Sequence, residues 1–124
     1  MTVGLASSVV NGWLDGTFST TNAWVKLHTA DPGSAGATAA AAGDTTRKQA
    51  TMASASGGPK AMTGTAGPWT NGGTSETLTH ISVWDASSAG NFLYSASLTA
   101  SQAWASTNTF TLNTLTVAIT PLAA

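Results

Sequence analysis

Short runs of alternating apolar and polar residues, separated by turn residues, are the feature that most limits how this chain can fold. The run at 23–29 places Val25 and Leu27 on one face, and the turn residues at 31–33 (Asp-Pro-Gly) end it. The run at 76–84 repeats the pattern and carries apolar residues on both faces toward its end. Alternation with a period of two is typical of half-buried strands, and apolar residues on both faces indicate a central strand.

The remaining sequence adds strands rather than helices. We expect them at 46–53, around 60–65, and at 92–98, 109–112 and 114–120. Short strands with glycine-rich turns predict a mainly β fold, a single antiparallel β-sandwich or small barrel with a short N-terminal helix. The predicted core is Val25, Leu27, Ile81, Val83, Leu93, Phe110, Leu115, Val117 and Ile119.

The helix is predicted at residues 2–14, where Thr2 is suited to cap its start. Leu5, Val9 and Trp13 are spaced four apart and fall on one helical face. Glycines at 12 and 16 favour an end to the helix there.

One domain spanning 1–124 is expected, because no linker divides the chain. It divides into an N-terminal helical arm at 1–16 and a β-domain at 20–124. An extended loop of small residues is predicted at 31–45 within that domain.

The low charge of the chain excludes several functions. Of 124 residues only 7% are charged, with a formal net charge of −1, against about a quarter in ordinary soluble domains. Four basic residues cannot neutralise a phosphate backbone, so no nucleic-acid partner is expected. No apolar run is long enough to cross a bilayer, so no membrane partner is expected either. Low charge is typical of a chain that works inside a large assembly.

The residue types that carry out catalysis are few and scattered. His28 and His80 lie in strand-like runs, and no third ligand at metal-binding spacing accompanies them. Most of the acidic residues lie beside turn residues, where they bond the backbone. A pair of carboxylates meeting in space could still support glycoside hydrolysis, but the sequence marks no catalytic cleft. We therefore predict no enzymatic activity, no catalytic residues, no metal site and no cofactor.

The five tryptophans are more numerous than a small core requires. Trp69 and Trp104 lie in or near predicted loops, where they could serve as interface anchors, core side chains or platforms for sugars. Arg47 and Lys48 form the one adjacent basic pair, which is either a partner contact or a solvated strand start. The interface candidates are Leu5, Val9, Trp13, Trp24, Arg47, Lys48, Trp69 and Trp104.

Several segments together resemble a known family. They are Asn-Ala-Trp-Val-Lys-Leu-His-Thr-Ala-Asp-Pro-Gly at 22–33, Thr-Arg-Lys at 46–48 and the run from Thr79 to Gln102, which contains His-Ile-Ser-Val-Trp-Asp-Ala and Gly-Asn-Phe-Leu. The chain resembles short tailed-phage virion proteins of the actinobacteriophage type, which are labelled minor capsid or tail-fibre proteins. None of these motifs is catalytic.

The resemblance implies a virion structural protein, located in the virion and assembled in the host cytoplasm. Our main expectation is a capsid decoration protein that binds the major capsid protein as a homotrimer. The N-terminal helix and the small-residue loop at 33–43 are the segments we expect neighbours to hold. The alternative is a minor tail or fibre-tip protein contacting host-surface glycan, and a cell-wall hydrolase is a third, weaker reading.

Overall fold

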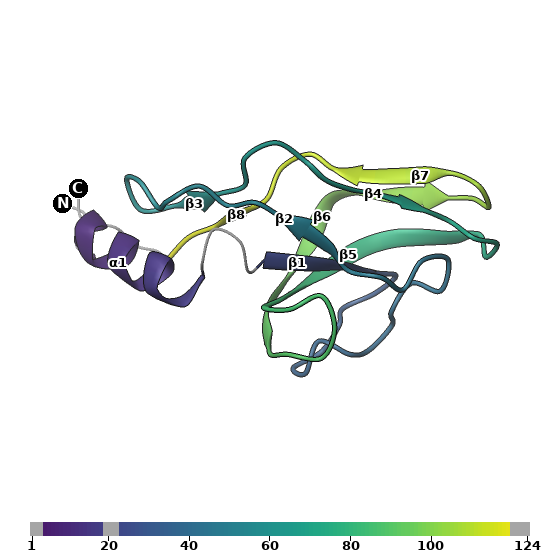
Figure 1. The fold of residues 1–124 in the computed structure, drawn as a ribbon, viewed down its shortest axis with the longest axis horizontal. Coiled ribbons are helices and arrows are strands. Elements are labelled where there is room, and N and C mark those ends of the chain that lie inside the picture. The colour runs from purple at the N-terminus through teal and green to yellow at the C-terminus, as the bar shows by residue number, and fades with distance from the viewer. Residues whose placement is uncertain (1–3, 19–22, 120–124) are drawn as a thin grey trace.

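The computed structural model describes residues 4–18 and 23–119, which form one helix and eight strands (Figure 1). The elements in chain order are α1 (Ser7–Thr17), β1 (Ala23–His28), β2 (Lys48–Ala50), β3 (Lys60–Ala61), β4 (Ala66–Thr70), β5 (Glu76–Trp84), β6 (Phe92–Trp104), β7 (Thr109–Leu112) and β8 (Thr116–Val117). The predicted fold class is therefore confirmed: the chain is mainly β, with a short helix near its start.

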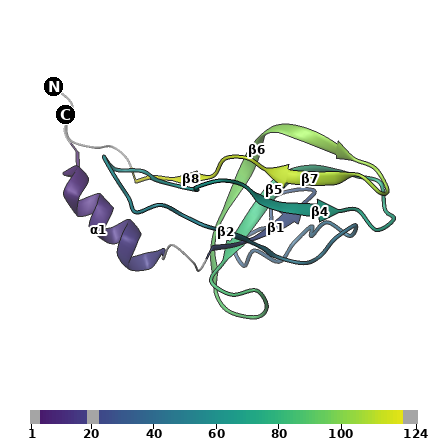
Figure 2. The same ribbon diagram turned by 45° about the horizontal axis from the view of Figure 1, so that its top comes forward.

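The strands form one four-stranded sheet in the order β2-β1-β5-β6 and two two-stranded sheets, β3-β8 and β4-β7. Every pairing is antiparallel. The pair β4-β7 lies over the four-stranded sheet, and α1 lies at the far end of the molecule (Figures 1 and 2). The hydrophobic core contains side chains from both of these layers.

Most of the predicted core is confirmed. Val25, Leu27, Ile81, Val83 and Leu115 are buried. Two more of the predicted residues, Leu93 and Phe110, are half-buried and pack against the core. The last two, Val117 and Ile119, are half-buried and lie outside the core cluster, because β8 pairs with β3 away from the main sheet.

Strand β6 carries a long bulge that shapes one side of the domain. Leu78 of β5 pairs with Gln102, whereas His80 pairs with Ser97, so the four residues 98–101 face Thr79 alone. Extra residues on one strand increase its bend and twist. Accordingly, β6 arches along the edge of the sheet in Figure 2.

The helix differs from its prediction in extent. It starts after Ala6 without a side-chain cap, and Gly12 and Gly16 lie inside it rather than ending it; Thr2, the expected cap, falls outside the described residues. Val10 and Leu14 are its buried residues. Val10 and Leu14 each follow one residue after Val9 and Trp13. Because one residue turns an α-helix by about 100°, the two stripes point in directions about 100° apart.

The small-residue loop at 31–45 contains turns at 33–36 and 38–39, and its own chain holds it in place. The backbone N–H of Thr29 donates to Ala39 O at 3.0 Å, and that of Ala41 donates to Leu27 O at 3.0 Å. The Glu76 carboxylate accepts the N–H groups of Ala42 and Gly43. Intramolecular hydrogen bonds to β1 and β5 therefore hold residues 39–43 of this loop, and the contact of residues 33–43 with a neighbour stays a prediction.

Candidate functional site

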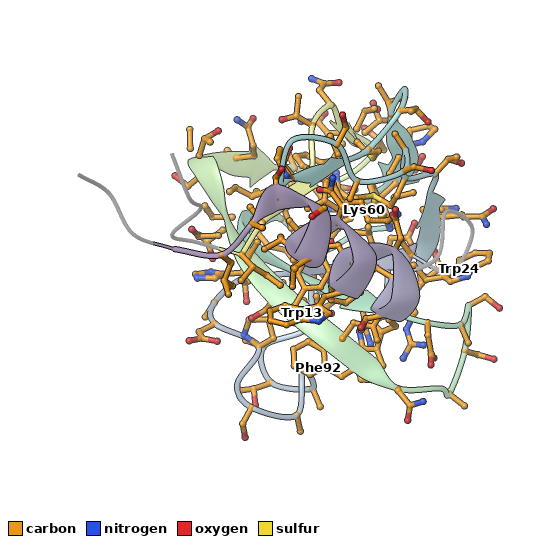
Figure 3. The ribbon with its side chains drawn as sticks, turned by 90° about the vertical axis from the view of Figure 1, so that its left-hand side faces the viewer. Trp13, Trp24, Lys60 and Phe92 are labelled. Carbon is orange, nitrogen blue, oxygen red and sulfur yellow. The ribbon has the colours of Figure 1, made fainter. Side chains whose placement is uncertain are left out.

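The outward face of α1 is the clearest exposed apolar surface among the described residues. Val9 is 43% exposed and Trp13 is 52% exposed, and they are the large hydrophobic side chains with the greatest exposure. Leu5 precedes the helix and is half-buried. Figure 3 views the molecule from the α1 end, with Trp13 projecting from the helix. We call Leu5, Val9 and Trp13 the helix stripe.

Contacts on the opposite side of α1 fix this orientation. Asp15 Oδ1 lies 2.7 Å from Lys60 Nζ, and the Lys60 side chain is only 1% exposed. Asp15 also accepts the backbone N–H of Ala55, and Asn11 Oδ1 accepts that of Gly58. The hydrogen bond from Lys60, followed by that from Ala55, holds the pKa of Asp15 below its ordinary value. The polar side chains of α1 contact β3 and the residues just before it, so the opposite face of α1 presents the helix stripe to solvent.

An aromatic row crosses the outer face of the four-stranded sheet. Trp24 pairs across the strands with Trp84, and Trp84 pairs with Phe92. The Arg47 guanidinium stacks 4.0 Å from the centre of the Trp84 ring. It also donates to the carbonyls of Ala86 and Ala89, so its hydrogen bonds hold the loop before β6.

Arg47 thus has a structural use within the chain. Arg47 is half-buried and bonded to its own loop, and Lys48 is half-buried at the start of β2. Trp24 is also half-buried, and Figure 3 shows its side chain at the periphery of the α1 end.

Trp69 and Trp104 are not exposed anchors, which corrects both candidates. Trp69 is 0% exposed and Trp104 is 2% exposed, and both belong to the core. Trp69 lies in β4 rather than in a loop, and a register shift between Ala66 and Trp69 turns its ring inward. The sequence concealed this strand because Gly67 and Pro68 interrupt the alternation. Of the three roles considered for these rings, the core role is the one they have.

His28 lies in β1, as its strand-like run predicts, and its side chain is fully buried. Its Nδ1 lies 2.8 Å from Thr38 O, and its Nε2 lies 2.7 Å from Ser82 Oγ. Trp84 Nε1 donates to the same Ser82 oxygen at 2.8 Å. A neutral imidazole satisfies this chain by donating from Nδ1 and accepting the Ser82 hydroxyl proton at Nε2. The loop at 31–45, folding over β1, is what buries this histidine.

We predict that acidification destabilises the fold through His28. Burial lowers the pKa of His28 from its ordinary value, with a further contribution from Lys26, and the Thr38 carbonyl only partly opposes this. The unfolded chain therefore binds the proton first, so stability is complete above about pH 6.5 and falls as the pH drops toward the lowered pKa. The measurement is the urea midpoint between pH 7.5 and pH 5.

His28→Gln should remove most of the change of the urea midpoint with pH, while His80→Gln should keep it. The pKa values of Asp15 and Asp85 are lowered from 3.8, so these carboxyls titrate below this window. An unchanged slope in His28→Gln would contradict the assignment.

A groove of about 620 Å³ opens between β6 and the segment from β7 to β8. Residues 96–100, 102 and 109–116 line it, together with Ile81. Sequence reasoning missed this groove, although the threonines at 109, 111, 114 and 116 were a signal for polar side chains along this segment.

Within the described ranges, no three histidine or acidic side chains gather so that they could hold a metal ion. The described part of the chain also contains no helix with the length and apolar character needed to cross a membrane.

The comparisons with known proteins identify the family. No curated protein matches the chain. A family model described as Podophage GP4 fiber I protein gp80 matches residues 1–120. This description agrees with the tail-fibre alternative and gives no support to capsid decoration or to an actinobacteriophage origin. The chain belongs to the Podophage GP4 fiber I protein gp80 family and is a phage fibre-type structural protein of the virion.

Proposed function

We propose that this chain is a non-enzymatic structural subunit of a phage fibre, joined to further copies of itself through the helix stripe. The observation that carries the proposal is the exposure of Val9 and Trp13 on a helix whose other side is fixed to the domain. Val9 and Trp13 are neighbours on the helix surface because they are four residues apart, and contiguous exposed apolar surface is typical of interaction sites.

The chemistry of the helix favours a second copy as the neighbour. The outward face carries no charged side chain, because Asp15, the one charged residue of α1, pairs with Lys60. A Cβ atom added at Gly12 or Gly16 would meet nothing within 4 Å, so the backbone beside Trp13 is open to close approach. Three uncharged stripes facing one axis would bury Val9 and Trp13 in each copy. The homotrimer expected from the sequence is the state we propose.

The absence of catalysis in this proposal is supported by the surroundings of the histidines. His28 Nε2 faces the Ser82 hydroxyl, but both residues are buried, and His28 Nδ1 faces a carbonyl rather than a carboxylate. His80 Nδ1 contacts the neighbouring Thr79 hydroxyl. A nucleophile that substrate cannot reach has no catalytic use.

Cysteine crosslinking tests the interface directly, because the natural chain has no cysteine. We expect Gly12→Cys to form disulfide-linked pairs about tenfold faster than Ser87→Cys, an exposed position in the loop after β5. Adding Trp13→Ser to Gly12→Cys should remove the difference. Sedimentation equilibrium of the unmodified chain should give the mass of three copies.

Equal crosslinking rates at the two positions would reject the self-contact. The copy number per virion then distinguishes a fibre partner from a capsid partner. A small multiple of three fits a fibre, whereas hundreds of copies would indicate the major capsid protein as the partner.

A second candidate function, contact with a glycan of the host surface, is favoured by a different observation. The groove beside β6 is lined by uncharged side chains, and eight of its fifteen lining residues carry a hydroxyl or an amide group. The test is binding of the purified protein to host cells before and after periodate oxidation of their surface sugars. Binding that survives oxidation would reject this function.

A further inference from the structure

The groove exists because two consecutive strands separate. β6 and β7 follow one another with only residues 105–108 between them, and Asn108 N–H donates to Ala105 O within this turn. Consecutive antiparallel strands joined by a short turn ordinarily pair with each other. Here β6 pairs with β5 and β7 pairs with β4, so the two strands diverge from the turn. The groove occupies the wedge between them.

The side chains around the groove are free to bind. Gln102, Thr111 and Asn113 are among the eight polar residues of its lining, and none of the eight side chains bonds another residue in the described part of the chain. Polar side chains in other places are used to hold loops, as Asn71 and Asp85 are. No charged residue lines the groove.

Apolar side chains complete the lining. Leu98 and Phe110 are half-buried, and Leu112 and Leu115 are buried beside them. A surface that combines apolar patches with hydroxyl and amide groups suits a ligand with apolar faces and many hydroxyls. The absence of charge selects against anionic ligands, which would lose hydration without gaining a cationic partner.

We propose that this groove binds a linear, uncharged oligosaccharide, an inference that rests on the glycan-contact function proposed above. The volume of about 620 Å³ lies within the range of ordinary small-molecule sites. An added peptide strand is the competing occupant, because β6 and β7 each have one unpaired edge. The bulge at 98–101 interrupts the edge of β6, so a regular hydrogen-bonded ladder cannot run along it.

The experiment uses the full chain on an array of linear hexasaccharides, in which each neutral sugar is matched by a form carrying a carboxylate. We expect binding confined to neutral members. Gln102→Ala should weaken it by about five- to tenfold, as expected for loss of one hydrogen-bonding side chain. Thr111→Trp, which fills the groove, should remove it.

Thr70→Trp is the matched control, since Thr70 is exposed on the neighbouring strand β4 and does not line the groove. It should bind as the unmodified chain does. No binding to any neutral sugar, a preference for the anionic forms, or binding that survives Thr111→Trp would overturn the proposal. Loss of fibre assembly in Thr111→Trp, without sugar binding by the unmodified chain, would assign the groove to a peptide strand instead.

Failure of this site and failure of the broader function remain distinguishable. Host-cell binding that is periodate-sensitive but unaffected by Thr111→Trp would move the glycan contact to another surface. Absence of periodate-sensitive binding by the unmodified chain would reject the glycan function as a whole.

Discussion

Replacing Trp69 by alanine is expected to lower the free energy of unfolding by about 3–5 kcal/mol, the usual loss for a buried tryptophan. The ring is completely buried, lies 6.0 Å from the ring of Phe110 and donates from Nε1 to Thr46 O at 3.0 Å. The substitution leaves a cavity between the two layers and an unbonded carbonyl before β2. In a domain of this size the melting temperature should fall by on the order of 10–20 °C.

Trp13→Ala is the matched control for this prediction, since it removes the same side chain from an exposed position. At protein concentrations low enough for the proposed trimer to dissociate, the free energy of unfolding should change by no more than about 0.5 kcal/mol. Thermal and urea unfolding of both variants measure the difference. Equal losses would mean that Trp69 is not a core residue.

Replacing Asn71 by alanine is expected to cost about 2–4 kcal/mol, because three hydrogen bonds of a buried side chain are lost together. Asn71 Nδ2 donates to the carbonyls of Thr74 and Trp104, and Oδ1 accepts the N–H of Gly73. The side chain thereby joins the loop after β4 to the end of β6. Without it, the Trp104 carbonyl loses the hydrogen bond from Asn71.

Asn113→Ala provides the control for Asn71, because Asn113 is exposed and its side chain bonds no other described residue. Its unfolding free energy should stay within about 0.5 kcal/mol of the unmodified chain. Hydrogen exchange supplies a second readout: amides at 72–75 and 105–108 should exchange faster in Asn71→Ala. Unchanged protection there would show that the backbone bonds alone hold these turns.

Strand positions and much of the core were predictable because alternation is a local property. β1 and β5 are regular enough that Val25, Leu27, Ile81 and Val83 could be assigned to one buried face. Trp69 could not be assigned in this way, since the bulge in β4 and the adjacent glycine and proline hide its strand. Trp104 ends β6 beyond the bulge at 98–101, where the alternation that began at Phe92 no longer gives the face.

The candidate surfaces were predictable only in part. The spacing of Leu5, Val9 and Trp13 marked a helical stripe, but the neighbouring stripe of Val10 and Leu14 is equally apolar. The contact between Asp15 and Lys60, which lies 45 positions further along the chain, decides which of the two stripes packs against the domain. The groove could not be predicted from the sequence either, because it depends on how β6 and β7 separate in the folded chain.

The sequence by itself determined the fold class, the antiparallel strands and the low charge that argues against a nucleic-acid partner, because these follow from residue type and short-range periodicity. Tertiary structure alone decided which tryptophans are buried, which face of α1 meets solvent, and that His28 lies beneath a loop. Those outcomes depend on bulges, register shifts and contacts between residues tens of positions apart. Such contacts are set by the packing of the whole chain, and no local pattern of residues encodes them.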